Sequence, residues 1–106
     1  MKPLYLCTVK MKIIMGKFNQ SIGSEQITFQ KVKDCYKTLP IGIHEVFKPE
    51  IGWYEPSYDW KGKSENDMAN DVWNLAMSGV EHFNFEVMNE YDTIVYPDFS
   101  LNELVK

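Results

Sequence analysis

The chain has 106 residues, of which 44% are hydrophobic and 25% charged, and its formal net charge at pH 7 is −4. This length is typical of one globular domain, residues 1–106, and the six Phe, six Tyr and three Trp provide enough apolar surface to exclude a disordered chain. No stretch approaches the roughly 18 apolar residues of a membrane span, and the N-terminal residues lack the pattern of a secretion signal, so we expect a cytoplasmic protein with no membrane partner.

The N-terminal third predicts two strands. Apolar side chains alternate with polar ones over residues 4–15, which indicates a half-buried strand, and residues 16–23 have the composition of a turn. Residues 25–33 alternate again, with Ile27 and Phe29 inward, and predict a second strand in an antiparallel hairpin with the first. We expect that strand to bulge or end near residue 32, where the alternation breaks.

The middle of the chain predicts one further strand and a long loop. Residues 34–40 are typical of a short helical turn closed by a proline, and residues 41–47 of a third strand. Residues 48–63 contain two prolines and two glycines, which favour a loop.

The clearest helix is predicted over residues 65–82. Ser64 is a favourable N-cap residue, and Asp67 follows at the capping-box position. From there on, apolar residues recur at helical spacing on one stripe and polar residues on the opposite stripe. We therefore expect an amphipathic helix with one buried face.

The C-terminal quarter predicts two short strands and a helical end. Residues 83–88 alternate, residues 89–92 have turn composition, and residues 93–96 predict a strand that a proline stops. Ser100 is placed to cap a short helix over residues 101–106, with a glutamate at the capping-box position.

The resulting order is β-β-β-α-β-β-α. Strands grouped on both sides of one good helix are typical of the α+β class. We expect an antiparallel sheet of about five strands with the one main amphipathic helix packed on one face.

Motifs of known catalytic chemistry are absent from the sequence, which has no nucleotide-binding glycine loop, zinc-protease motif or nucleophile elbow. Cys7, Cys35, His44 and His82 lack the close ligand pair of a usual zinc site, and Cys35 with His44 and Asp34 lacks a cysteine-hydrolase signature. We expect no catalytic residue, metal or cofactor, and two reduced thiols, with a Cys7–Cys35 bridge as the alternative.

The predicted loop over residues 48–63 is unusually aromatic. Its four candidate anchors are Trp53, Tyr54, Tyr58 and Trp60. Such rings either cover the end of a core, anchor a protein partner, or bind a small ligand by stacking. The sequence leaves all three interpretations open.

Charge is segregated along the chain. The first 44 residues carry seven lysines and two carboxylates, whereas Ser64 to Val105 carry nine carboxylates and neither Lys nor Arg. Such asymmetry indicates a partner surface, although a solvated helix face is the simpler interpretation. The candidate partner-binding residues are Asp67, Asp71, Glu81, Glu86, Glu90 and Asp92.

These patterns predict a non-enzymatic protein-interaction module whose acidic C-terminal half binds a basic surface of a partner, such as a nucleic-acid-binding protein. The lysine-only basic set and frequent asparagine suggest an A·T-rich genome, so one form of this function is a phage or mobile-element inhibitor of a host nucleic-acid enzyme. The alternative is a small-ligand-binding domain or small enzyme that uses the aromatic loop over residues 53–60. We expect no direct nucleic-acid binding, because the lysines are not interleaved with aromatic residues.

Overall fold

The computed structural model describes residues 23–106, so the predicted strand over residues 4–15 and almost all of the turn after it lie outside the described residues. Within that range helical segments and strands occur in groups rather than in strict alternation. In chain order they are η1 (Gly23–Gln26), α2 (Gln30–Tyr36), β1 (Gly42–Lys48), β2 (Gly52–Tyr54), α3 (Glu65–Met77), β3 (His82–Met88), β4 (Ile94–Val95), β5 (Asp98–Ser100) and η2 (Leu101–Leu104).

The strands form an antiparallel sheet with β3 at its centre. β1 pairs with β3 on one side and with β2 at its own outer edge, while β4 and β5 both pair with the other side of β3. The register of β1 against β3 shifts between Ile43 and Glu45, which is a β-bulge. The predicted strands over residues 41–47 and 83–88 are therefore confirmed. In contrast, β2 lies within the segment predicted as loop, and β5 follows the proline expected to stop the strand over residues 93–96.

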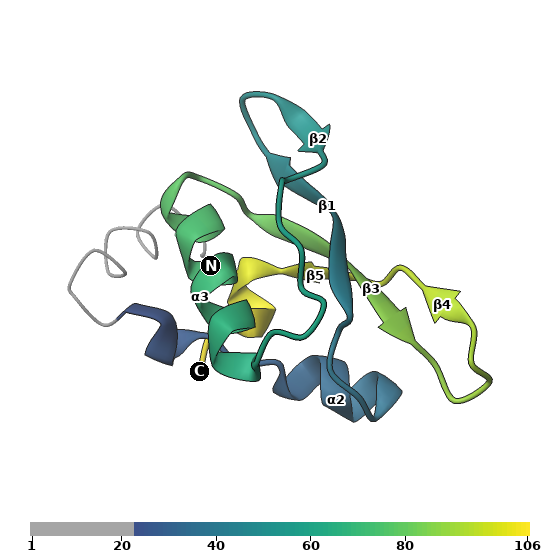
Figure 1. The fold of residues 1–106 in the computed structure, drawn as a ribbon. Helices are drawn as coiled ribbons and strands as arrows, with labels where there is room; N and C mark the ends of the chain where they lie inside the picture. Colours follow the sequence, from purple (N-terminus) through teal and green to yellow (C-terminus); the bar gives the residue numbers. More distant parts are fainter. Residues whose placement is uncertain (1–22) are drawn as a thin grey trace, which may run out of the picture.

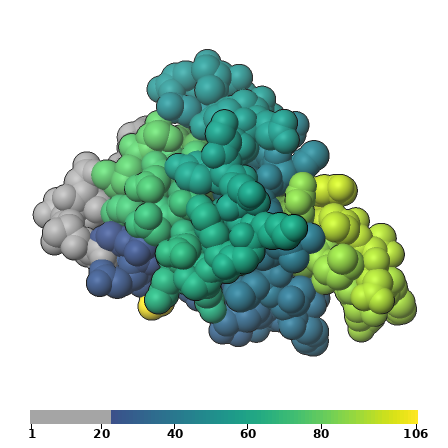
Figure 2. Space-filling view, in the orientation of Figure 1, coloured from purple at the N-terminus to yellow at the C-terminus, as the bar shows by residue number. Residues whose placement is uncertain are grey.

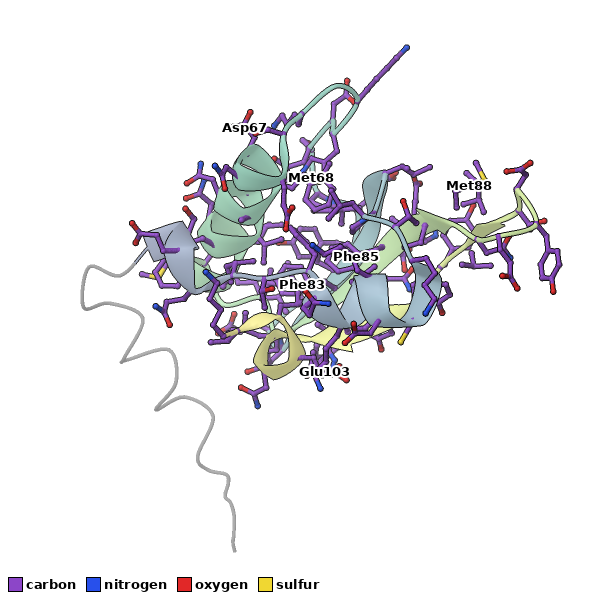
Figure 3. The ribbon with its side chains drawn as sticks, turned by 90° about the horizontal axis from the view of Figure 1, so that it is seen from below. Asp67, Met68, Phe83, Phe85, Met88 and Glu103 are labelled. Carbon is purple, nitrogen blue, oxygen red and sulfur yellow. The ribbon has the colours of Figure 1, made fainter. Side chains whose placement is uncertain are left out.

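The two faces of the sheet have different environments. Along β3, the alternate residues Phe83, Phe85 and Val87 are fully buried, while the residues between them are half-buried. The buried face packs against α3 and α2 in one hydrophobic core, as Figures 1 and 3 show. The expected α+β class, with an antiparallel sheet of about five strands, is confirmed.

Helix α3 begins as its sequence predicts. The Ser64 hydroxyl accepts a hydrogen bond from the Asp67 backbone N–H at 3.1 Å. The helix ends at Met77 rather than at residue 82, because Gly79 adopts a left-handed conformation (φ 111°). The N–H groups of Gly79 and Val80 then bond the carbonyls of Ala76 and Leu75, which is a Schellman motif.

The strand predicted over residues 25–33 is wrong. Ile27 forms only an isolated bridge with Val105, and α2 begins three residues later, at Gln30. Phe29 and Val32 are fully buried and Tyr36 packs against the same core, a spacing of three and then four residues. The apolar residues that suggested a strand thus belong in part to the buried stripe of a helix. Packing against the core decided between the two-residue period of a strand and the 3.6-residue period of a helix.

The segment from residue 55 to residue 63 lies across the buried face of the sheet. It runs from β2 to α3 and crosses in front of β1 in Figure 1. In the space-filling view this segment, α3 and α2 together cover the face that is turned to the viewer (Figure 2). The sheet is therefore enclosed by helices and loop on this side.

The C-terminus is tied to the rest of the domain. The short helix predicted after Ser100 is present as η2, and the Glu103 carboxylate accepts a hydrogen bond from the Ser100 N–H at 2.8 Å. The backbone of Lys106 donates to Gln26, and Thr28 donates to Leu104. No helix among residues 23–106 has both the length and the apolar character that a membrane span requires.

Candidate functional site

The four candidate aromatic anchors separate into two groups. Trp60 is buried (3% exposed), and Tyr54 and Tyr58 pack against the core from its edge. The Trp60 ring contacts Phe29 and Phe85 at centroid distances of 6.0 and 5.8 Å. Three of the four rings therefore cover the core, and Trp53, 45% exposed on β2, is the one whose ring is open to a partner.

Asp71 is not part of an exposed acidic surface, which corrects its assignment as a partner-binding residue. It lies on the buried side of α3, where its Oδ2 accepts hydrogen bonds from Trp60 Nε1 at 2.8 Å and from Lys63 Nζ at 2.9 Å. The hydrogen bond to Asp71 raises the pKa of Lys63 above its usual value, and the nearby charges of Asp71, Asp67 and Asp59 act in the same direction. A buried carboxylate with these partners belongs to the structural core of the domain.

The other five acidic candidates do not form one continuous patch. Asp67 lies in the first turn of α3, while Glu90 and Asp92 lie in the turn between β3 and β4. Figures 1 and 3 place α3 and this turn at opposite ends of the molecule. Glu81 precedes β3, and Glu86 lies within it, on the face turned away from the helices.

That face of the sheet is the best candidate for a functional surface, and we name it the open face. By strand register and side-chain contact it includes His44, Glu45, Phe47, Trp53, His82, Asn84, Glu86, Tyr96 and Asp98. Among residues 23–106, this face carries three carboxylates and no lysine. Lys48 in β1 lies on the opposite face. Its side chain passes close to Gly79, where an added Cβ would lie 3.2 Å from Lys48 Cε.

One end of the open face groups a histidine with a carboxylate and a tyrosine. His44 Nδ1 lies 4.0 Å from Glu86 Oε2, and the His44 ring packs against Tyr96 at a centroid distance of 4.6 Å. The bulge between Ile43 and Glu45 allows both His44 and Glu45 to reach this side of the sheet. The Glu86 carboxylate also lies over Gly42, where any larger residue would meet it at 2.9 Å.

The other end of the open face is aromatic. Phe47, Trp53 and His82 lie on three adjacent strands, and Asp98 comes next, on β5. His82 Nδ1 lies 3.7 Å from Asp98 Oδ1. Two adjoining hollows, of about 210 and 310 Å³, lie here and share Trp53 and Asp98 in their walls.

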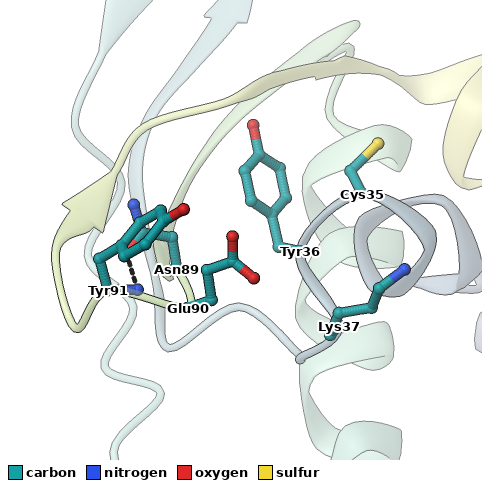
Figure 4. Close-up of a pocket in the computed structure, with 6 residues that line it drawn as sticks. All are labelled: Cys35, Tyr36, Lys37, Asn89, Glu90 and Tyr91. Atoms are coloured by element: carbon teal, nitrogen blue, oxygen red, sulfur yellow. Dashed lines mark hydrogen bonds between the residues drawn. The ribbon is translucent and has the colours of Figure 1, made fainter.

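A separate hollow of about 390 Å³ lies between the end of α2 and the turn from β3 to β4 (Figure 4). Its lining residues are Cys35, Tyr36, Lys37, Asn89, Glu90 and Tyr91. The Asn89 side chain accepts hydrogen bonds from the backbone N–H groups of Tyr91 and Thr93 and so fixes the turn. Because Lys37 and Glu90 offer opposite charges, this hollow has no single electrostatic preference.

The chemical alternatives raised by the sequence find no support in the described residues. Cys35 is a free, exposed thiol within the described part of the chain, whereas Cys7, its partner in the alternative bridge, lies outside the described residues. His44 contacts Glu86 and Tyr96 on the open face rather than Cys35 on α2. Among residues 23–106, no three His, Cys, Asp or Glu side chains are grouped closely enough to hold a metal ion.

Sequence reasoning identified only Trp53 and Glu86 of the open face as partner-binding candidates. It missed Glu45, Phe47 and Asp98. The alternation in residues 83–88 was a usable signal for the outward face of that strand, whereas the bulge between Ile43 and Glu45 breaks the alternation in β1. The register that places Glu45 opposite Asn84, and Asn84 opposite Asp98, is a tertiary feature.

Comparisons of the chain with models of protein families, with curated proteins and with solved structures found no match, so function has to be inferred from the surface itself.

Proposed function

We propose that the chain is a non-enzymatic protein-interaction module that binds a basic surface of a partner protein through the open face of its sheet. One observation carries the proposal. Trp53 is 45% exposed on a strand, in a face where the full charges contributed by residues 23–106 are the carboxylates of Glu45, Glu86 and Asp98.

An exposed tryptophan in a strand is a suitable interface anchor. Tryptophan provides a large apolar area with few rotatable bonds, so binding it costs little side-chain entropy. Trp53 is held further by Phe47, whose ring lies 5.5 Å away, centroid to centroid. The anchor is thus presented in a largely fixed orientation before a partner arrives.

The charges of the open face favour a basic partner. Carboxylates around an apolar anchor attract a cationic surface during encounter and select against acidic partners. Nucleic-acid-binding proteins carry cationic surfaces of this kind. An inhibitor that covers the nucleic-acid site of such a protein, for example in a phage or mobile element, is one form that this function takes.

The test compares two variants with equal changes in charge. The first reverses the open face with Glu45→Lys, Glu86→Lys and Asp98→Lys, and the second reverses three exposed carboxylates elsewhere with Asp34→Lys, Asp59→Lys and Asp67→Lys. Both variants and the native protein are immobilised and exposed to cell lysate at about 50 mM and about 500 mM salt, across the range in which surface charges become screened.

The proposal expects a basic protein to be captured by the native chain and by the second variant at low salt, and to be absent with the first variant. High salt should weaken the capture. Circular dichroism of each variant confirms that the fold is retained. Equal capture by all three proteins would overturn the proposal, and selective loss with the second variant would assign binding to the acids outside the sheet.

A further inference from the structure

The aromatic end of the open face has the geometry of a receptor for one cationic side chain. The rings of Phe47, Trp53 and His82 lie close to one another, with centroid distances of 5.5, 5.9 and 6.4 Å. Together with Asp98 they line a hollow of about 210 Å³, which leaves room for a side chain rather than for a larger ligand.

Two carboxylates flank the exposed ring. Asp98 contributes to both hollows of this corner, and Glu45 lines the adjoining one, of about 310 Å³, together with Trp53 and Asn84. Trp53 is therefore bordered by negative charge. An aromatic face beside carboxylates attracts a cation both by cation–π interaction and by direct ion pairing.

The Asn84 amide, a further polar group of the corner, adds to this preference. Asn84 Nδ2 donates to the backbone carbonyls of Tyr96 at 2.6 Å and of Pro97 at 3.2 Å. Its amide donors are thus already used, and the side-chain oxygen is what Asn84 can offer a ligand. The corner is better supplied with acceptors than with donors, which suits a ligand rich in N–H groups.

We propose that this corner binds an arginine side chain of the partner, an inference that rests on the proposed function. A planar guanidinium stacks on an indole and donates two parallel hydrogen bonds to one carboxylate, whereas a lysine ammonium is a compact and strongly hydrated charge. A guanidinium is more weakly hydrated than an ammonium, so it loses less hydration free energy when its flat face packs on these rings.

The probe is a short peptide with a central arginine between glycines, compared with the same peptide carrying citrulline or lysine. Citrulline has nearly the shape of arginine without its charge. Binding is followed in the amide and indole NMR spectrum of the full chain, in which the Trp53 indole signal is identified by its loss in Trp53→Phe.

We expect the arginine peptide to shift the Trp53 indole and Asn84 side-chain signals, with an affinity about tenfold higher than that of the citrulline peptide. Asp98→Asn should weaken the arginine peptide by a similar factor, whereas Asp59→Asn, an exposed carboxylate outside the open face, should leave it unchanged. Any one of three results would overturn the arginine site. These are equal affinity for the arginine and citrulline peptides, equal or higher affinity for the lysine peptide, and unchanged affinity for the arginine peptide in Asp98→Asn.

The peptide result and the partner result are separable. If the arginine peptide leaves the Trp53 signal unmoved while partner capture still requires Glu45, Glu86 and Asp98, the arginine site fails and the proposed function stands. If the peptide binds as expected and partner capture is indifferent to those carboxylates, the proposed function fails and the arginine site stands as a property of the corner alone.

Discussion

The buried contact between Trp60 and Asp71 distinguishes a structural role of these two residues from a binding role. Trp60 is 3% and Asp71 6% exposed, and the indole N–H donates to the carboxylate at 2.8 Å. Replacing Asp71 by alanine leaves the indole N–H buried without an acceptor. The loss of a hydrogen bond to a charged group and the desolvated donor together predict a destabilisation of about 2–3 kcal/mol.

Two further variants separate the components of this contact. Asp71→Asn retains an oxygen that can accept from the Trp60 N–H but loses the charge, so we expect a smaller loss of about 1 kcal/mol. Trp60→Phe removes the donor, and combining it with Asp71→Ala should reveal a coupling energy of about 1.5 kcal/mol in a double-mutant cycle. Asp67→Asn, one turn earlier on the exposed side of α3, should cost less than about 1 kcal/mol.

Urea unfolding followed by circular dichroism measures each value as a shift of the midpoint at constant slope. The reasoning is refuted if Asp71→Ala unfolds within about 0.5 kcal/mol of the native chain, since that is the range of an ordinary surface substitution. A coupling energy near zero in the cycle would show that the two side chains do not stabilise each other in solution.

Three further predictions concern Lys63 and two local structures. The pKa of Lys63 is raised in the folded state above its usual value of 10.5. The stabilisation from protonated Lys63 is therefore complete below pH 10.5 and disappears as the pH rises through the pKa of the folded state. Above pH 10.5 the native chain should lose stability faster than Lys63→Gln, which urea unfolding at several pH values would measure. Ser64→Ala removes the α3 cap and should cost about 1 kcal/mol, whereas Ser57→Ala in the preceding loop should remain within about 0.5 kcal/mol of the native chain in the same assay. Asn89→Ala removes the acceptor of two backbone N–H groups, so hydrogen exchange of the amides in the turn from β3 to β4 should become faster, without a comparable change in β1. Unchanged exchange rates in the turn of the variant would contradict a stabilising role of Asn89.

Local signals in the sequence were sufficient for the best-formed elements. The start of α3 followed from Ser64 and the helical stripe, and the strand over residues 83–88 followed from alternation. These signals are carried by neighbouring residues, whose backbone conformations and side-chain directions are coupled over a few positions. The α+β class could be predicted because the order of such elements restricts how they can pack.

Short elements were decided by packing. Residues 25–33 contain too few alternations to distinguish a strand from a helix, and the burial of Phe29, Val32 and Tyr36 on one side selected the helix α2. Similarly, β2 and β5 have three residues each, and their strand conformation is stabilised by pairing with β1 and β3. A segment of that length has no strong preference of its own.

The sequence by itself determined the α+β class and the uneven distribution of charge, because composition and periodicity are local properties. Only the tertiary structure decided which charged groups and aromatic rings are exposed to a partner and which are buried in the core. Asp71 and Trp60, adjacent to exposed residues in the sequence, are buried together, while Trp53, Glu45 and Asp98 from three strands meet on the open face. Strand register and the side on which a helix packs depend on contacts between residues far apart in the chain, and no local pattern encodes them.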